Sequence, residues 1–372
     1  MKRATYLDGV KGIACIGVFL YHFNTLFHGQ VVNIQFDASS MDFFFGKLIK
    51  LFVDGPLLVM IFALVSGWLT AHTNIPTVNS FLKRIFIRYL RFTLPLLPVL
   101  LLIRLFSQMH LFYTSEAYEL LGIVSFENSI YSLPMNLMEG IRQGLYKILL
   151  LRDNAWDAPL WMFSGIFWGS ILVYFLTWLK TKINNPNIMA LISAVTAFFS
   201  YQYWESTSVM VILGAAVYWY EDVLKKIPDW FVYLASALSI MMVYGLHHWL
   251  YHWLCMHRYF TPMLDYTIQW RMLYSFILFY AIMRSRRLQS IFSYNLFVKL
   301  GKISFAIFLI HWPLLCSFST WCFCTRTLPY TIAFWLILIA SLILLFAICI
   351  IYGSVEKCCA DIINRVKILI NA

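Results

Sequence analysis

The chain has 372 residues, of which 61% are hydrophobic and only 12% are charged, and its formal net charge is +11. Soluble globular proteins are about 45–50% apolar and about 25% charged, so this composition excludes an ordinary soluble domain and predicts an all-α, polytopic membrane protein. The positive charge does not predict nucleic-acid binding. The basic residues lie in short segments between apolar runs, as in cytoplasmic loops beside anionic lipid.

A helix needs about 20 apolar residues to cross a bilayer. By this criterion we expect about ten transmembrane helices, both termini in the cytoplasm, and a single membrane domain over residues 1–372 without an appended soluble domain. Most of the 28 Lys and Arg residues then fall on the inner side, in agreement with the positive-inside rule. The predicted spans are 10–28, 50–72, 89–108, 159–179, 188–204, 206–220, 230–250, 270–284, 303–323 and 331–353.

The first predicted span carries three ionisable residues: Asp8, Lys11 and His22. Charged groups are costly inside a membrane, so their presence indicates a functional site. Lys11 and His22 lie within roughly 20° of each other around a helix, and Asp8 lies within about 40° of that face. Histidine at this position suits a general base. The spacing alone equally fits a lysine that extends to the interface and a histidine bonded to a neighbouring backbone.

The span at 50–72 contains the segment LVSGWLT, residues 64–70. The small residues Ser66 and Gly67 predict a close contact between helices. Ser66 would act as a nucleophile only beside a base, which the sequence does not place.

Arg84, Arg88 and Arg91 follow at i, i+4 and i+7, where the third span begins. They form one basic stripe on the predicted helix. Guanidinium groups suit phosphates because they offer planar, paired donors. Anchoring of the helix at the cytoplasmic surface is the simpler interpretation of the stripe taken alone.

A long segment, about 109–158, separates the third and fourth spans on the predicted outer side. Loops of this length are usually functional. We expect an amphipathic helix near 136–151 within it.

No metal site is predicted. His248 and His252 lie four residues apart in the segment 247–257, but an interfacial cluster with the neighbouring tryptophans is the preferred interpretation. The eight cysteines show neither zinc-finger spacing nor a disulfide framework.

The segment LGKISFAIFLIHWPLL, residues 300–315, combines a glycine before a helix with His311, Trp312 and Pro313 near mid-span. Pro313 predicts a kink or a bend. A kink beside a buried histidine fits either a site or a purely structural feature.

Together these segments resemble acyltransferase family 3, integral-membrane enzymes that acylate sugars of surface polysaccharides and other extracytoplasmic acceptors. The opening LDGVKGIACIGVFLYHF is similar to the family's first-helix signature, including the spacing from Lys11 to His22. The pair Arg88 and Arg91 is similar to its arginine motif, and residues 300–315 to its penultimate-helix block. Glu356 stands where an acidic residue commonly ends the last span.

One position departs from the family pattern. In the block PLWMFSGIFWGSIL, Trp161, Gly169 and Ser170 fit, but Ile166 stands where many members have glutamate.

The resemblance implies a multi-pass protein of a bacterial plasma membrane that transfers an acyl group, most simply acetyl from acetyl-CoA, to a hydroxyl of a glycan or lipid-linked saccharide. His22 would be the general base or acyl carrier, Lys11 would support the donor and Asp8 would orient Lys11. Arg84, Arg88 and Arg91 would hold the phosphates of coenzyme A. The alternatives are a transporter or flippase for a lipid-linked saccharide, although no internal repeat supports it, and an inactive scaffold in polysaccharide assembly.

Overall fold

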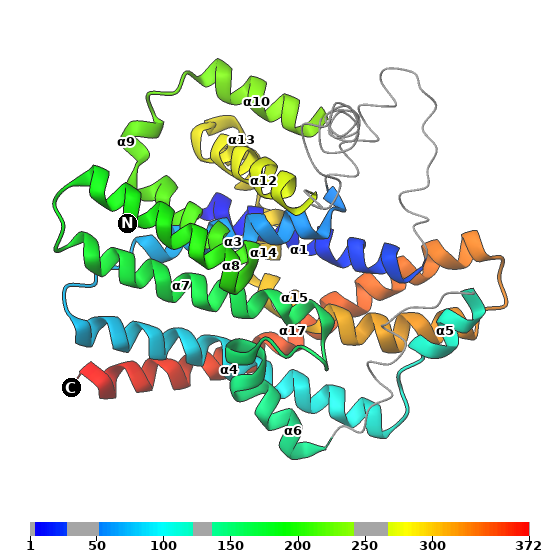
Figure 1. Cartoon of the computed structure of the whole chain (residues 1–372). Coiled ribbons are helices and arrows are strands. Elements are labelled where there is room, and N and C mark those ends of the chain that lie inside the picture. The colour runs from blue at the N-terminus through cyan, green and yellow to red at the C-terminus, as the bar shows by residue number, and fades with distance from the viewer. Residues whose placement is uncertain (1–3, 28–51, 122–135, 242–266, 372) are drawn as a thin grey trace. The chain divides into compact units, whose positions relative to one another are not determined.

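The structure is a computed structural model that describes residues 4–27, 52–121, 136–241 and 267–371. These residues form helices and their connections, without a β-strand, as the composition predicted (Figure 1). The chain divides into two compact units. Unit 1 comprises residues 1–21, 30–78 and 168–302, and unit 2 comprises 22–29, 79–167 and 303–372.

Unit 1 holds most of α1 and the middle of the chain. The glycine-rich N-terminal half of α1 packs on α13 and α14, and α3 packs on α8 and α12. Its helices are α1 (Thr5–Leu26, to Tyr21), α3 (Gly55–Ala71), the second half of α7 (Trp161–Lys180), α8 (Pro186–Trp219), α9 (Glu221–Leu224), α10 (Asp229–Met241), α12 (Thr267–Arg284), α13 (Arg286–Phe292) and α14 (Asn295–Lys302).

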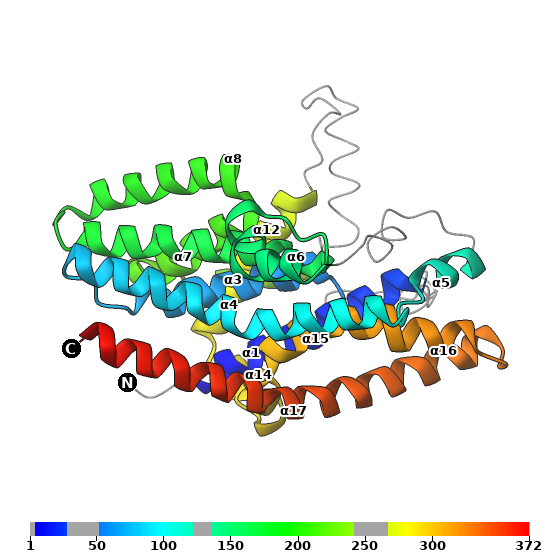
Figure 2. The ribbon, with the colours of Figure 1, turned by 90° about the horizontal axis from the view of Figure 1, so that it is seen from below.

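Unit 2 holds the end of α1, the long helix α4 and the C-terminal helices. Figure 2 shows α17 running beside the helices that precede it, with which it is in contact. The elements are α4 (Val78–Gln108), α5 (Thr114–Leu121), α6 (Leu137–Arg142), η2 (Gln143–Leu151), η3 (Ala158–Leu160), the start of α7, α15 (Ser304–Leu314), η5 (Leu315–Ser319), α16 (Thr320–Cys324) and α17 (Tyr330–Asn371).

Four segments of the described chain are long and apolar enough to cross a membrane: 78–108, 158–180, 304–324 and 330–370. They contain the spans predicted at 89–108, 159–179, 303–323 and 331–353. Shorter apolar helices occur at 55–71, 206–219 and 229–240. The total of ten spans and the cytoplasmic termini stay predictions, and the end of the span at 230–250 lies outside the described residues.

The long helix α8 covers two predicted spans, 188–204 and 206–220. The hydroxyl oxygens of Ser200 and Ser208 are within hydrogen-bond distance. In a straight helix eight residues advance about 12 Å, so the axis of α8 bends back between these serines. The bend lies at the boundary that the sequence predicted between the two spans.

The amphipathic helix predicted near 136–151 is confirmed as α6 followed by the π-helical turn η2. The side chain of Asn136 caps α6 by accepting a hydrogen bond from the backbone N–H of Glu139. Lys147 then donates to the carboxylates of Glu139 at 2.5 Å and Asp153 at 3.3 Å. These hydrogen bonds raise the pKa of Lys147 and close the segment on itself.

The close contact predicted at Ser66–Gly67 is also confirmed. A Cβ placed on Gly67 in α3 would lie 1.8 Å from the carbonyl oxygen of Val211 in α8. Reciprocally, a Cβ on Gly214 would lie 2.0 Å from the carbonyl oxygen of Leu64. Glycine on both helices therefore allows their backbones to touch, and this backbone contact forms the centre of unit 1.

Gly67→Ala is expected to lower the thermal stability of the purified protein, because the new methyl group must push two backbones apart at a cost of about 1–3 kcal/mol. Gly353→Ala is the matched control, since nothing lies within 4 Å of its Cβ position. It should leave the unfolding temperature unchanged or slightly raised, as alanine favours helix. Equal unfolding temperatures for Gly67→Ala and the unmodified protein would contradict the α3–α8 contact.

Candidate functional site

Asp8 and Lys11 form the predicted ion pair on α1. Their side chains are three residues apart, and the distance from Asp8 Oδ1 to Lys11 Nζ is 2.9 Å. The backbone here lies tightly against α14 within unit 1, because a Cβ on Gly301 would lie 1.8 Å from the carbonyl oxygen of Asp8. Gly301 thus allows the close approach that holds Asp8, and Asp8 in turn holds the ammonium group of Lys11.

His22, in unit 2, lies beside a second histidine. Its ring centroid is 5.3 Å from that of His311 and 5.2 Å from that of Trp312. His22 is only partly buried, whereas His311 is 1% exposed. Of the two residues, His22 is therefore the less buried.

The hydrogen bonds of His311 determine which of its nitrogens carries a proton. Nδ1 lies 2.8 Å from the carbonyl oxygen of Phe308, so it is the nitrogen that donates. Nε2 then carries a lone pair in the neutral ring. It is buried and has no hydrogen-bond partner among the described residues. The sequence singled out His311 on its kinked helix but did not pair it with His22.

Aromatic rings hold this histidine in place. Phe308 lies 5.5 Å from the ring of His311, and Phe163 of α7 stacks on Phe308 at 5.3 Å. Phe92 of α4 meets Phe163 edge-on at 5.1 Å. Pro313 and the π-helical turn η5 follow directly, which confirms the predicted break in the helix.

The three arginines lie on α4, as the spacing predicted, but not in equivalent surroundings. Arg88 lies over the ring of Phe92, with its guanidinium carbon 5.1 Å from the ring centroid. Arg91 instead lines a cavity of about 210 Å³, called here the basic cavity. The other residues around it are Pro95, Phe305, Glu356, Cys359, Ala360, Ile363, Asn364 and Lys367.

Lys367 is a site residue that the sequence analysis missed. The charges of Arg91 and Arg84 act on its ammonium group, so three cations gather at this cavity. Within the described residues neither Arg91 nor Lys367 has a carboxylate at salt-bridge distance. The carboxyl group of Glu356 lines the same cavity, so its lining carries two basic residues and one acidic residue. The signal in the sequence was the helical spacing of Glu356, Ala360, Ile363 and Lys367 beyond the predicted end of the last span at 353.

Comparison with known families identifies the chain. The family model described as an acyltransferase domain, that of acyltransferase family 3, matches residues 4–353. The chain belongs to acyltransferase family 3. No curated protein and no solved structure matches it. The protein is therefore an acyltransferase, and its apolar helices identify it as an integral membrane protein.

The match to acyltransferase family 3 ends at residue 353, before Glu356, Asn364 and Lys367. These residues of the basic cavity thus come from the part of α17 that follows the family domain. Ile166, at the position of the family's frequent glutamate, is a buried residue of α7. The histidine cluster at 247–257 lies outside the described residues.

A further ion pair of this acyltransferase was also missed from the sequence. Asp54 caps α3, and both of its carboxylate oxygens lie 3.1 Å from Nε of Arg271 in α12. The signal was the acidic residue Asp54 inside the predicted span 50–72 and the basic residue Arg271 inside the predicted span 270–284, since intramembrane charges usually pair.

Asp157 is a buried carboxyl group directly before the apolar segment 158–180. Its exposed fraction is 0%, and neither oxygen has a hydrogen-bond partner among the described residues. Burial raises the pKa of Asp157 well above its ordinary value.

The raised pKa makes Asp157 a source of pH-dependent stability. The folded state keeps a proton that the unfolded chain releases above about pH 4, so this residue lowers the stability progressively as the pH rises above that value. Asp157→Asn should therefore unfold at a higher temperature than the unmodified protein at pH 7, and at a similar temperature near pH 4. Thermal unfolding from pH 4 to pH 8 measures the difference. A difference that does not grow with pH would contradict a buried, protonated Asp157.

Proposed function

We propose that this protein is a membrane O-acyltransferase of the bacterial plasma membrane. It moves an acyl group, most simply acetyl, from cytoplasmic acyl-CoA to a hydroxyl of an extracytoplasmic or lipid-linked saccharide. The observation that carries the proposal is the histidine pair of unit 2, in which the ring of His22 lies 5.3 Å from the buried ring of His311. An imidazole that reaches substrate is what acyl transfer to a hydroxyl requires.

In the proposed reaction His22 accepts the proton of the acceptor hydroxyl while the oxygen of that hydroxyl attacks the carbonyl carbon of the thioester. The carbon–sulfur bond then breaks, and the thiolate of coenzyme A leaves and takes the proton from His22. The alternative is that His22 carries the acyl group transiently before the hydroxyl attacks. In either course His311 is a positioning residue, because its own N–H is engaged by the carbonyl of Phe308.

The basic cavity supports the choice of donor. Coenzyme A carries several phosphates, and paired guanidinium donors and an ammonium group bind phosphate well. Arg91 and Lys367 line the cavity, and Arg84 adds its charge to theirs. We assign the phosphates of the donor to this cavity, whereas Arg88 supports the site through its contact with Phe92.

Asp8 and Lys11 belong to the same proposal. The family resemblance assigns Lys11 to the support of the donor, and the 2.9 Å ion pair with Asp8 orients its ammonium group. This assignment rests on the family's first-helix signature and on the observed pair.

His22→Ala is expected to abolish acyl transfer. The measurement is consumption of radiolabelled acetyl-CoA by the purified protein in lipid nanodiscs, with a surface-glycan extract as acceptor. Loss of a general base lowers the rate by about 10²–10⁴-fold. Product that persists in His22→Ala would remove the role assigned to His22, and no turnover by the folded unmodified protein would favour an inactive scaffold.

His110→Asn is the matched control. His110 lies in an exposed turn at φ 52°, a backbone conformation that asparagine tolerates. This variant removes an imidazole elsewhere in unit 2 and should keep full activity. A loss equal to that of His22→Ala would indicate damage to the protein rather than to the site.

Arg91→Ala and Lys367→Ala are each expected to raise the KM for acetyl-CoA about tenfold or more, because a hydrogen bond to a charged group contributes about 1.5–3 kcal/mol. The effect should shrink with a donor that lacks one phosphate. Arg365→Ala is the control, since Arg365 is exposed and lies about 200° around the same helix from Lys367. An unchanged KM in Arg91→Ala and Lys367→Ala would reduce these residues to surface anchors.

A further inference from the structure

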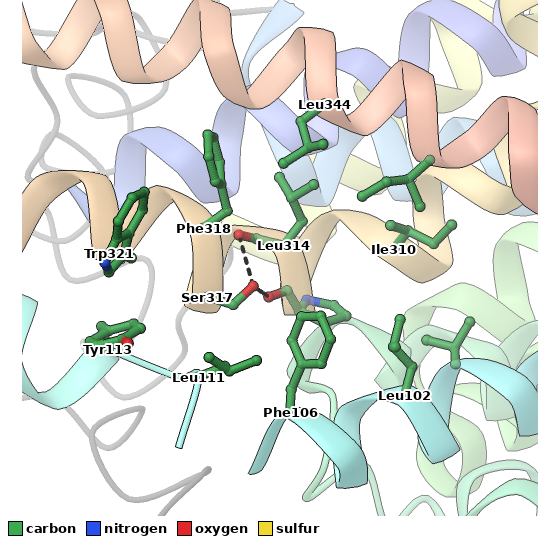
Figure 3. A pocket seen from close by; sticks show the side chains of 13 residues that line it. Leu102, Phe106, Leu111, Tyr113, Ile310, Leu314, Ser317, Phe318, Trp321 and Leu344 are labelled. Atoms are coloured by element: carbon green, nitrogen blue, oxygen red, sulfur yellow. Dashed lines mark hydrogen bonds between the residues drawn. The ribbon is translucent and has the colours of Figure 1, made fainter. Parts of the chain in front are cut away.

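Unit 2 contains a second cavity, of about 300 Å³, called here the apolar cavity (Figure 3). Its walls come from α4, the segment after it, the run from α15 to α16, and α17. Figure 3 shows Leu102 and Phe106 facing Ile310, Leu314 and Leu344 across it. Every wall except the short connection at 111–113 is a segment that can span a membrane.

The chemistry of this lining excludes a polar ligand. Almost all of the lining side chains are aliphatic or aromatic. Ser317 is the one aliphatic hydroxyl among them, and it donates to the carbonyl oxygen of Pro313 at 2.7 Å, on its own helix. A buried water needs two to four polar partners, so an apolar cavity of this kind stays dry or holds hydrocarbon.

Hydrogen bonds hold the walls of the apolar cavity in place. The π-helical turn η5 frees the carbonyl of Cys316, which accepts hydrogen bonds from the backbone N–H of Tyr113 at 3.1 Å and from the hydroxyl of Thr114 at 3.3 Å. On the other side, the hydroxyl oxygens of Ser319 and Ser341 lie 2.7 Å apart. These bonds hold the wall η5 against both of its neighbours.

The position of the apolar cavity relative to the basic cavity indicates which ligand the apolar cavity binds. On α4, Arg91 and Pro95 line the basic cavity and Val99 to Phe106 line the apolar one. Helix α17 also lines both cavities. Residues 356–367 line the basic cavity, and Leu344 and Ile348 line the apolar cavity.

On the run from α15 to α16, the basic cavity meets Phe305, and the lining of the apolar cavity starts at Ile310, next to His311, and continues to Trp321. Phe305 lines the basic cavity about 9 Å along the axis from His311 in one direction, and Leu314 lines the apolar cavity about 5 Å in the other. Under the proposed function, the phosphates of the donor lie in the basic cavity. The hydrocarbon of the apolar cavity therefore belongs to the other substrate.

We propose that the apolar cavity binds the alkyl chain of a lipid-linked acceptor, so that the acceptor's saccharide hydroxyl is presented to His22. This inference rests on the proposed function. It narrows the acceptor from any glycan to one that carries a polyprenyl or similar hydrocarbon chain and enters from the bilayer.

The test of binding uses a photoreactive acceptor. The full-length protein in phosphatidylcholine–phosphatidylglycerol nanodiscs is irradiated with a polyprenyl-diphosphate-linked N-acetylglucosamine whose chain carries a diazirine. Crosslinks are expected in peptides that contain Leu111–Tyr113, Leu314–Trp321 and Leu344–Ile348. Unlabelled polyprenyl-linked saccharide should abolish them, and excess phosphatidylcholine should not. Competition by phosphatidylcholine would assign the cavity to bulk lipid, and competition by palmitoyl-CoA would assign it to the donor; either result overturns the proposal.

The kinetic test compares Leu344→Trp with Ile343→Trp. Leu344 lines the cavity, whereas its neighbour Ile343 is 66% exposed on α17. Leu344→Trp should raise the KM for the polyprenyl-linked acceptor about tenfold, which is roughly the effect of excluding two methylenes. The KM for acetyl-CoA and for the methyl glycoside of the same sugar should stay unchanged. Ile343→Trp should change none of these constants, and an equal effect of both variants would contradict the cavity's role.

The two hypotheses fail in different ways. Absence of turnover with every acceptor would refute the proposed function, while the crosslinks still decide whether the cavity binds the polyprenyl chain. Turnover with the methyl glycoside at the same KM as with the polyprenyl-linked sugar would refute only the apolar cavity as an acceptor site. Leu344→Ala, which enlarges the cavity, is the second variant if Leu344→Trp fails to fold, and it should keep the polyprenyl-linked sugar as the preferred acceptor.

Discussion

Helix α15 is buried along its whole length, and the arrangement of unit 2 depends on how it satisfies its polar groups there. A buried donor without a partner is costly, so His311, Ser317 and Thr320 all turn their donors onto carbonyls of their own turn. For His311 this leaves Nε2 buried, with a lone pair and no hydrogen-bond partner among the described residues. The same requirement that stabilises the helix therefore orients the imidazole that lies beside His22.

The proline and the π-helical turn that follow give this helix its second role. A regular helix would present one continuous face, but Pro313 and η5 shift the face and free the carbonyl of Cys316. That carbonyl accepts hydrogen bonds from the backbone N–H of Tyr113 and from the hydroxyl of Thr114. Tyr113 also lines the apolar cavity. A local departure from α-helical geometry thus makes room for a ligand without leaving a backbone group unpaired.

The buried charges of unit 1 follow the same rule. Asp54 with Arg271 and Asp8 with Lys11 are pairs, as the cost of burial demands. In unit 2, Arg91 and Lys367 line one cavity together with Glu356, and the charge of Arg84 also acts on Lys367.

The sequence by itself determined the helical class, the family, the positions of the four longest apolar segments and the residues of the first helix, although α4 and α17 are longer than the spans predicted for them. Hydrophobic length and helical spacing are local properties, so the i, i+3 pair of Asp8 and Lys11 and the helix near 136–151 followed from them. The small residues Ser66 and Gly67 likewise indicated close helix packing at Gly67. Only the tertiary structure brought His22 beside His311, separated Arg91 from Arg88, and added Lys367, because these neighbours lie up to hundreds of residues apart in the chain. Which residues meet across such distances depends on how helices pack and bend, and no local pattern encodes that.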